Sequence, residues 1–501
     1  MKLRNLAIVI TGLIPFGAAA EEALPPVDQH RLNQLIYDGK ALEAFLEAFE
    51  QGDELTELSF DSARGVGAYI GEGRRFTRVP RADLTGPMEW ANHVPQREGG
   101  ANATSCIACH NAPFANGAGD VALNVLVDPA HTGDPSKYLE RNTLPLFALG
   151  IPQRLAEEIS MDLYLQRANA RQIACHIGTS TVRLQSKGVD YGALTMTRVS
   201  ETPCKVDTDT SALSGIDADL VIRPFGWKGN QPTIRAFTRN AAHNELGLQA
   251  VELVGAKDGD FDGVVNELTV GDMTALTIYM AGLERPVSKL ELADLGLIEL
   301  DAAERADIQA GEALFATVGC AGCHVPSMTF QDTMFHEPSM VPGFYDKTFP
   351  DGSDPAAHGL SHEVSISFRL DQDQPNNQIK LADGSTHLLG ALAQDETGRP
   401  VARWFTDFKR HDMGPDLADP SDPLGLGASM FLTRSLAGVG VTGPWLHDGR
   451  ATTLDEAIVA HGGDAAASAK KYQALAKSEQ AQIVSFLENL TMYKSEEEED
   501  H

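Results

Sequence analysis

Two stretches of sequence decide how this chain folds: Cys106-Ile-Ala-Cys109-His110 and Cys320-Ala-Gly-Cys323-His324. In a C-x-x-C-H motif the two thiols add to the vinyl groups of a haem, and the following histidine binds the iron. Zinc sites and thioredoxin-like dithiols also use cysteine pairs, but a histidine directly after both pairs favours haem. The sequence therefore predicts two covalently bound c-type haems, with His110 and His324 as iron ligands.

The two motifs lie far apart in the chain, so we expect each to belong to its own unit. Alternating strand patterns are few, and 46 glycines and 26 prolines indicate long loops. The predicted fold is mainly α, with two cytochrome c-like haem domains and long irregular loops. We expect a signal peptide at 1–20, an N-terminal extension at 21–54, the haem domains at 55–290 and 300–494, and an acidic tail at 495–501.

Hydrophobic periodicity predicts four helices within these domains. They cover residues 270–285, 302–315, 454–461 and 478–490. The first closes the N-terminal haem domain before Pro286. The second leads into Cys320, as a helix packed beside a haem site would.

Composition limits the function and the compartment. The 501 residues carry 40 Lys and Arg against 70 Asp and Glu, a net charge of −30 that excludes nucleic acid as a partner. Lys2 and Arg4, an apolar run at 6–16 and Ala18-Ala19-Ala20 form the pattern of a cleavable export signal. The run is too short for a transmembrane segment, and no later stretch qualifies. We therefore expect a periplasmic protein.

The remaining two cysteines, Cys175 and Cys204, stand alone in the sequence. A turn-rich polar stretch separates them, and disulfides persist in the compartment that export predicts. We expect them to form one structural disulfide.

A second axial ligand for the C-terminal haem follows from the helix at 454–461. Thr453 is a good N-cap with Glu456 three residues later, and Gly462-Gly463 supplies a stop. His461 then lies on the inward face of this helix. An inward histidine can also be an ordinary core residue, so its role as a ligand is a hypothesis.

Several ordered motifs resemble the di-haem oxidoreductase family, whose members are often labelled thiol oxidoreductases. They are Phe225-Gly-Trp-Lys-Gly-Asn-Gln-Pro232, His411-Asp-Met-Gly-Pro415, and Trp445-Leu-His-Asp-Gly-Arg-Ala-Thr-Thr-Leu454 with His461-Gly-Gly463. That family is similar to bacterial di-haem cytochrome c peroxidases and MauG-like enzymes. The resemblance covers roughly residues 55 to 490, both haem motifs included. No third C-x-x-C motif supports thiol chemistry, so the family's label is a poor guide to the reaction.

The resemblance implies roles for three further residues. His461 matches the distal ligand of the C-terminal haem, so that His324 and His461 would make a six-coordinate electron-transfer site. Met413 is a competing ligand, because methionine in a Gly-Pro loop is a familiar haem contact. Trp227 matches the tryptophan between the two haems, where it would relay electrons.

Glu245 resembles the distal acid of the peroxidases. Cleaving an O–O bond requires a proton to move between the two peroxide oxygens, and a carboxylate above an open iron can carry it. The chain departs from the peroxidase pattern in its shorter spacing from Trp227 and in Phe237, which stands where a polar residue is usual. His243 and His131 could instead ligate the first haem and close it.

Two calcium sites are predicted on separate grounds. Thr442 and Pro444 match positions whose carbonyls hold Ca²⁺ in the peroxidases. Independently, residues 258–263 have the D-x-D-x-D-G spacing of a calcium loop, with Asp258, Asp260 and Asp262 as ligands. Thr269 stands where an EF-hand places its bidentate glutamate, so a full EF-hand is not expected. The alternative to a partial calcium loop is a solvated acidic turn.

The leading expectation is a periplasmic di-haem oxidoreductase that reduces hydrogen peroxide or a related oxidant at the haem on His110. The alternatives are a non-enzymatic electron-transfer cytochrome and a MauG-like oxidase of a protein or small molecule. After removal of Lys2 and Arg4 the charge is near −32. A basic soluble electron carrier of the cytochrome c or cupredoxin type is the partner that such a surface favours.

Overall fold

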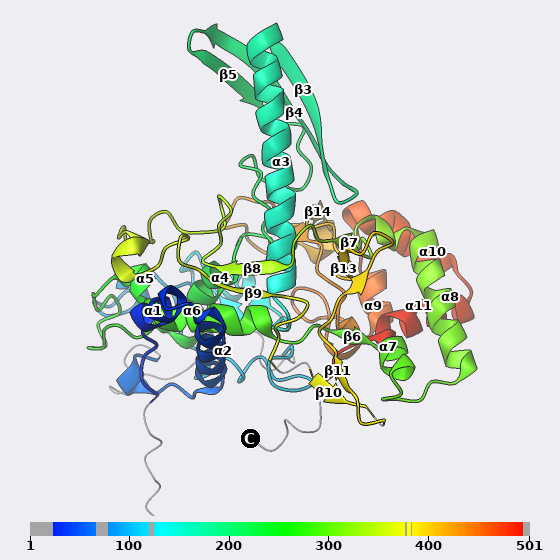
Figure 1. The fold of residues 1–501 in the computed structure, drawn as a ribbon, viewed down its shortest axis with the longest axis horizontal. Coiled ribbons are helices and arrows are strands. Elements are labelled where there is room, and N and C mark those ends of the chain that lie inside the picture. Colours follow the sequence, from blue (N-terminus) through cyan, green and yellow to red (C-terminus); the bar gives the residue numbers. More distant parts are fainter. Residues whose placement is uncertain (1–23, 67–78, 120–124, 376–377, 382, 494–501) are drawn as a thin grey trace, which may run out of the picture.

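The structure is a computed structural model that describes residues 24–66, 79–119, 125–375, 378–381 and 383–493 (Figure 1). The predicted signal peptide and acidic tail lie outside these residues. Within them, no helix combines the length and the apolar character needed to cross a membrane.

Eleven α-helices are found in the described residues. They are α1 (Gln29–Tyr37), α2 (Ala41–Glu57), α3 (Gly150–Ile177), α4 (Ile234–Ala241), α5 (Val251–Val254), α6 (Val270–Gly282), α7 (Lys289–Asp294), α8 (Ala302–Val318), α9 (Leu454–Val459), α10 (Ala466–Ala474) and α11 (Lys477–Asn489). A π-helix, η6 (Ala242–Leu246), directly continues α4.

The strands form small antiparallel sheets, most of them two-stranded. They are β1 (Val125–Val127), β2 (Leu139–Arg141), β3 (Thr179–Ser186), β4 (Val189–Glu201), β5 (Cys204–Asp209), β6 (Val287–Ser288), β7 (Met328–Thr329), β8 (Met334–Glu337), β9 (Ile366–Arg369), β10 (Gln378–Lys380), β11 (Thr386–Leu388), β12 (Ala393–Gln394), β13 (Pro400–Ala402), β14 (Arg410–Asp412), β15 (Met430–Leu432) and β16 (Leu490–Thr491).

The prediction of a mainly α fold is wrong. Helices make up 36% of the described residues and strands 16%. Most strands are two to four residues long, too short to produce a readable alternation. In the longest strand, β4, buried residues alternate with partly exposed ones only in the first half, and the neighbouring strands β3 and β5 are mostly exposed.

The four predicted helices are confirmed as α6, α8, α9 and α11, with ends shifted by a few residues. The predicted capping box of α9, between Thr453 and Glu456, is present. The helix ends at Val459, so His461 follows its last turn. The domain boundaries at 290 and 300 stay predictions.

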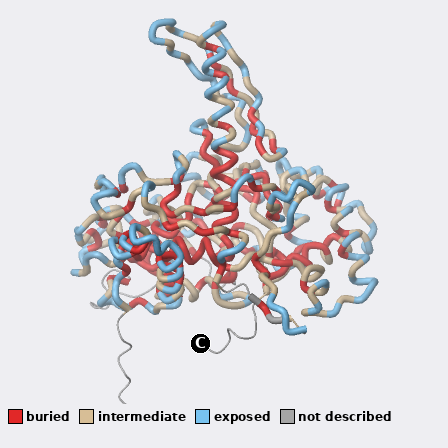
Figure 2. The backbone as a smooth tube through the Cα atoms, in the orientation of Figure 1, coloured by how far each residue is buried: buried red, intermediate tan, exposed pale blue. Residues whose placement is uncertain are grey.

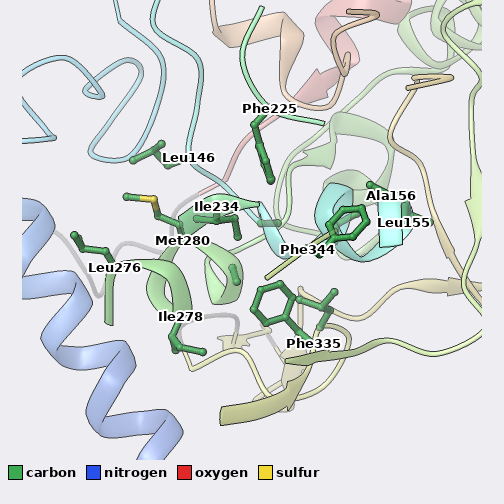
Figure 3. Packing of buried hydrophobic residues seen from close by; sticks show 14 of the residues in the cluster. Leu146, Leu155, Ala156, Phe225, Ile234, Leu276, Ile278, Met280, Phe335 and Phe344 are labelled. Carbon is green, nitrogen blue, oxygen red and sulfur yellow. The ribbon is translucent and has the colours of Figure 1, made fainter. Parts of the chain in front are cut away.

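The larger core is built around α6, every residue of which is buried (Figure 3). Helix α2 packs directly on α6, where a Cβ on Gly52 would come within 2.3 Å of the Ala275 carbonyl oxygen. No larger residue fits at position 52 without moving the helices apart. Segments on both sides of the chain contribute to this core, among them Phe335 and Phe344.

A smaller core joins α8, α9 and α11. Its buried members include Phe315, Leu454, Tyr472, Ile483 and Phe486. Phe486 is fully buried and its ring lies 5.3 Å from that of Phe315. This core fixes α8 and α9 on two sides of the second C-x-x-C-H motif.

A projecting arm is the most conspicuous feature of the outline (Figure 1). It consists of the 28-residue helix α3 and the sheet β3-β4-β5 packed along it. The base of α3 is buried, whereas the outer part of the arm is mostly exposed (Figure 2). A disulfide between Cys175 and Cys204, with Cα atoms 5.9 Å apart, joins the end of α3 to the start of β5.

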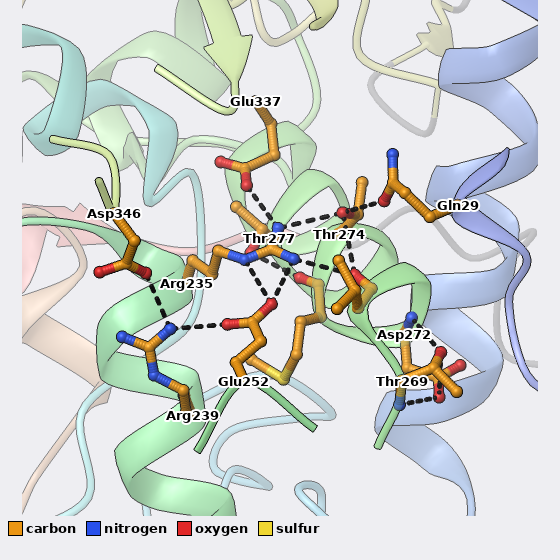
Figure 4. Close-up of polar contacts among 12 residues, drawn as sticks. Gln29, Arg235, Arg239, Glu252, Thr269, Asp272, Thr274, Thr277, Glu337 and Asp346 are labelled. Atoms are coloured by element: carbon orange, nitrogen blue, oxygen red, sulfur yellow. Dashed lines mark hydrogen bonds and ion pairs between the residues drawn. The ribbon is translucent and has the colours of Figure 1, made fainter. Parts of the chain in front are cut away.

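A buried ionic network ties α4 to its neighbours (Figure 4). Arg235 pairs with Glu252 and with Glu337, and Arg239 pairs with Glu252 and Asp346. Two guanidinium groups thus offset three carboxylates within the interior. The network holds α4 and therefore the start of the π-helix η6.

Candidate functional site

The second C-x-x-C-H motif begins where α8 ends. Gly319 has φ +102, a left-handed conformation that turns the chain into the short helical turn Cys320–Gly322. The backbone N–H of His324 donates to the Cys320 carbonyl at 3.0 Å. The ring of His324 is held from its other side, because its Nδ1 donates to the Phe405 carbonyl at 3.2 Å.

His461 faces His324 across a cavity. Its Nδ1 donates to the Ala457 carbonyl at 2.7 Å, one turn back along the chain. The two imidazole centroids are 6.4 Å apart, with ring planes at 59°. In both histidines Nδ1 therefore carries the proton and Nε2 is left as a potential ligand.

This arrangement fits an iron between the two rings. Two metal–imidazole bonds of about 2 Å on opposite sides place ring centroids about 6 Å apart. Burial lowers the pKa of His324 to about 4, with a further contribution from His461, and burial also lowers the pKa of His461. Both rings are therefore neutral at pH 7, as ligands must be.

A cavity of about 350 Å³ contains this pair. The residues used below that line it are Leu144, Trp227, Cys320, Cys323, His324, His411, Met413, Arg434, Thr442, Pro444 and His461. Met413, the competing ligand, thus lies on the same cavity. The facing imidazole rings favour His461 over Met413.

Trp227 lines the same cavity as the second C-x-x-C-H motif. Its indole N–H donates to the Asn142 carbonyl at 2.9 Å. Asn142 lies two residues before Leu144, which also lines the cavity. The role of Trp227 as a relay stays a prediction.

Arg434 adds a positive charge to the same cavity. Its guanidinium lies 5.7 Å from the Trp227 ring and donates from Nη1 to the carbonyls of Pro224 and Gly226. Its Nε is buried without a partner, and it pairs with no carboxylate of the described residues. Burial lowers the pKa of Arg434 to about 10. A haem propionate is an anion of the kind that such a cation requires.

His411 lies beside the C-terminal motif. Burial acts to lower the pKa of His411, whereas its hydrogen bond to Asp407 and the charge of Asp407 act to raise it. The Nε2 of His411 lies 2.8 Å from Asp407 Oδ2. Asp407, His411 and Cys323 form one close group in the structure.

The first motif is held by its own turn and by the π-helix η6. The backbone N–H of His110 donates to the Cys106 carbonyl at 3.0 Å, and the backbone N–H groups of Asn102 and Ala103 donate to the Glu245 carbonyl. Burial lowers the pKa of His110 to about 4, so its ring is neutral at pH 7.

Glu245 lies beside the cysteines of this motif. After burial, the charge of Glu245 is the next largest cause of the raised pKa of both the Cys106 and Cys109 thiols. Burial in turn raises the pKa of Glu245 to about 7. A π-helical turn often marks a functional position in an α-helix. The geometry thus places a carboxyl group that titrates near neutrality next to the first motif.

The two histidines that could close the first site differ in their surroundings. His243, two residues before Glu245, is buried, and neither ring nitrogen has a hydrogen-bond partner among the described residues. Burial, with the charge of Arg97 next, lowers the pKa of His243 to about 3. His131 instead donates from Nε2 to the Arg97 carbonyl at 2.7 Å. His131 therefore keeps Nδ1 as a potential ligand, and His243 keeps both ring nitrogens, so both histidines stay candidates for closing the first site.

The two predicted calcium sites also differ. Asp258, Asp260 and Asp262 are brought together, with one carboxylate oxygen of each within 4.8 Å of the others. Thr442 and Pro444 line the central cavity, and the Pro444 carbonyl accepts from Asn142 Nδ2 at 2.6 Å.

Sequence reasoning missed Arg434, Asn142 and the ionic partner of His411. Arg434 follows the buried strand β15 with nothing in its local sequence to distinguish it from other arginines. Asn142 acts through its backbone carbonyl, which carries no residue-specific signal. Only His411 lay in a motif, and its partner Asp407 is four residues earlier.

One family model matches the chain, at residues 377–490, and its description is "Di-haem oxidoreductase, putative peroxidase". This confirms the resemblance that the motifs predicted. The matched segment contains Met413, Arg434 and His461 but neither C-x-x-C-H motif. The match supports a di-haem oxidoreductase in general and leaves the reaction open.

Similar solved structures include a MauG-like protein associated with microbial copper homeostasis. It is 17% identical over 68% of this chain and 88% of that chain, with a TM-score of 0.27. Another is a hydrazine synthase of Kuenenia stuttgartiensis, 18% identical over 44% of this chain, with a TM-score of 0.21. This chain spans 56% of that hydrazine synthase chain. No curated protein matches the chain.

Proposed function

Taking the match to di-haem oxidoreductases as the premise, we propose that the chain is an exported peroxidase of this kind. It reduces hydrogen peroxide at a first site on His110 and receives electrons through a second site on His324 and His461. Cys106 and Cys109 hold one haem covalently, and Cys320 and Cys323 hold the other. Haem bound at His110 supplies the iron to which peroxide binds and the electrons for its reduction.

Glu245 is the proton carrier in this proposal. Peroxide cleavage needs a group that takes a proton from one oxygen and returns it to the other, which is most effective when its pKa is near the working pH. The partly buried Glu245, whose carboxyl lies beside Cys106 and Cys109 and has a pKa of about 7, has this property. It is the observation that carries the proposal.

Three other residues serve electron transfer. His324 and His461 present fixed, neutral imidazoles whose Nδ1 protons are bound to carbonyls, so the second site changes little between oxidation states. Trp227 lines the cavity of the second site and relays electrons. The acidic surface, with net charge −30 over the full chain, attracts a basic cytochrome c or cupredoxin as electron donor.

The test replaces Glu245 by Gln. We expect peroxide cleavage to slow by about 10²- to 10⁴-fold while the absorption spectrum of both haems is unchanged. Glu157→Gln is the matched control, because Glu157 is a buried carboxyl on α3 whose pKa burial also raises. Turnover by Glu245→Gln at the rate of this control would remove Glu245 from the mechanism.

A second candidate function is electron transfer without catalysis, and His243 favours it. Its buried ring without a hydrogen bond could ligate the first iron and exclude peroxide. The resting spectrum distinguishes the two. A high-spin first haem that changes on adding peroxide supports the peroxidase, whereas two low-spin haems inert to peroxide support the carrier. If the chain is such a carrier, His243→Ala should convert the first haem from low-spin to high-spin.

A further inference from the structure

The loop between α5 and α6 gathers three carboxylates on one short turn. Asp258, Asp260 and Asp262 approach within 4.8 Å of one another. Backbone hydrogen bonds fix two of these carboxylates in place. Asp258 accepts from the backbone N–H groups of Asp262 at 3.2 Å and Gly263 at 3.0 Å, and Asp262 accepts from that of Val264 at 2.7 Å. Like charges held this close repel one another unless a cation separates them.

Asp260 supplies an observation independent of this clustering. It is 0% exposed, and its Oδ2 pairs with the equally buried Arg97 at 2.6 Å. Its other oxygen, Oδ1, is buried and has no hydrogen-bond partner among the described residues. A buried carboxylate oxygen without a partner is costly. A metal ion is the partner that this oxygen lacks.

The local charge has the same implication. When ionised, the three carboxylates carry two more negative charges than the one guanidinium that pairs with them, that of Arg97. A divalent cation bound between the carboxylates balances this excess.

We propose that residues 258–264 bind one Ca²⁺ through Asp258, Asp260 and Asp262. Oxygen donors select hard cations, and a flexible loop of carboxylates suits Ca²⁺ better than the smaller, strictly octahedral Mg²⁺. Thr269 cannot complete an EF-hand, because its side chain caps α6 together with Asp272. Lacking the bidentate ligand, the loop should bind with a dissociation constant of about 10⁻⁴ to 10⁻³ M, as in extracellular modules.

The cation would also act on the first haem site. Arg97, which pairs with Asp260, donates to the carbonyl of Gly247, the residue that ends the π-helix carrying Glu245. A Ca²⁺ ion that fixes Asp260 therefore fixes Arg97 and the end of this helix. The binding itself does not depend on the proposed peroxidase activity.

Titration calorimetry of the haem-loaded protein with CaCl₂, after removal of bound metal by a chelator, tests the site. Asp262→Asn and Asp258→Asn should each weaken binding at least tenfold. Asp383→Asn is the matched control, since Asp383 accepts hydrogen bonds from Ser385 in an exposed turn outside the cluster. If a second calcium ion binds near Thr442 and Pro444, then Asp258→Asn, Asp262→Asn and Asp383→Asn should all retain that second binding event. Affinity and stoichiometry equal to wild type in both loop variants would overturn the proposal.

Thermal unfolding separates lost binding from lost folding. In chelator the loop variants should melt close to wild type, because Asp258 and Asp262 are only partly buried. Added Ca²⁺ should raise the melting temperature of wild type and of Asp383→Asn, but not of Asp262→Asn. An equal rise in all three proteins, or none in wild type at about 10 mM Ca²⁺, which exceeds the expected dissociation constant, would show that this loop is not the site.

Discussion

Replacing His461 by Ala should open the second haem site without unfolding the protein. The facing rings of His324 and His461, 6.4 Å apart, leave room for an iron bonded to both. Removing one imidazole takes away the sixth ligand, so a low-spin haem becomes high-spin. The first haem should keep its spectrum, because His461 lines the cavity of the second motif and no residue of the first motif lines it.

The cost to stability is small and can be derived from the contacts. His461 makes one side-chain hydrogen bond, to the Ala457 carbonyl, worth about 1 kcal/mol. It also follows the end of α9, so no helical residue changes. The variant should therefore fold, with a gap the size of one imidazole ring beside the iron. Free imidazole at about 10 mM should enter this gap and restore the low-spin spectrum. The imidazole of His461 binds at a high effective concentration because the backbone holds it in place, and a high concentration of free imidazole replaces that advantage.

The assay is the visible and electron paramagnetic resonance spectrum of the ferric protein with and without imidazole. Met413→Ala is the matched control, because Met413 lines the same cavity and is the competing ligand. We expect Met413→Ala to remain low-spin. If Met413→Ala becomes high-spin and His461→Ala does not, the inference from the ring spacing is refuted.

Three further predictions address other parts of the molecule. Burial disfavours the charged carboxylate and raises the pKa of Glu245 to about 7, so the base form of Glu245 predominates only above that pH. Peroxide turnover by the wild type should therefore rise between about pH 6 and 8, and turnover by Glu245→Gln should show no such rise. A nearby cation favours the reduced haem, and a unit charge about 10 Å from the iron contributes roughly 1.7 kcal/mol at an effective dielectric constant of about 20. Arg434→Gln should therefore lower one midpoint potential by about 70 mV in a spectroelectrochemical titration, whereas Arg434→Lys, which keeps the charge, should shift it less. Replacing Cys175 and Cys204 by Ser opens a loop with a sequence separation of 29 and should destabilise the arm by about 3 to 4 kcal/mol, seen as faster hydrogen exchange in α3 and β5 with both haem spectra unchanged.

The short helix α9 was predictable because its signals are local. Thr453, Glu456 and the two glycines after His461 all lie within eleven residues, and the capping box forms as the sequence indicates. The same holds for α6, whose cap residues Thr269 and Asp272 are three apart. Where a helix is specified by its own ends, neither tertiary contact nor a partner is needed to predict it.

The arm was not predictable on the same terms. Helix α3 begins with buried residues at its base and continues for several turns with exposed ones such as Leu165 and Ile177. Its buried residues follow one stripe, but the outer half contributes only Ala170 and Ala174 to it, so the apolar face is weak there. The sheet beside it is polar on much of both faces, so its strands lack the alternation that a half-buried strand shows. The mainly α prediction failed chiefly at such exposed or very short strands.

The two haem sites differ in a property that their identical motifs do not contain. In the second site each histidine is held by a carbonyl, of Phe405 or Ala457, and faces the other ring. Near the first motif, the pKa of Glu245 is raised, and neither ring nitrogen of His243 has a hydrogen-bond partner among the described residues. Fixed ligands on both sides of an iron suit electron transfer, whereas an acid that titrates near neutrality suits proton transfer. Under the proposed function, the division of roles between the two motifs would therefore follow from the surroundings of each motif and not from the motifs themselves.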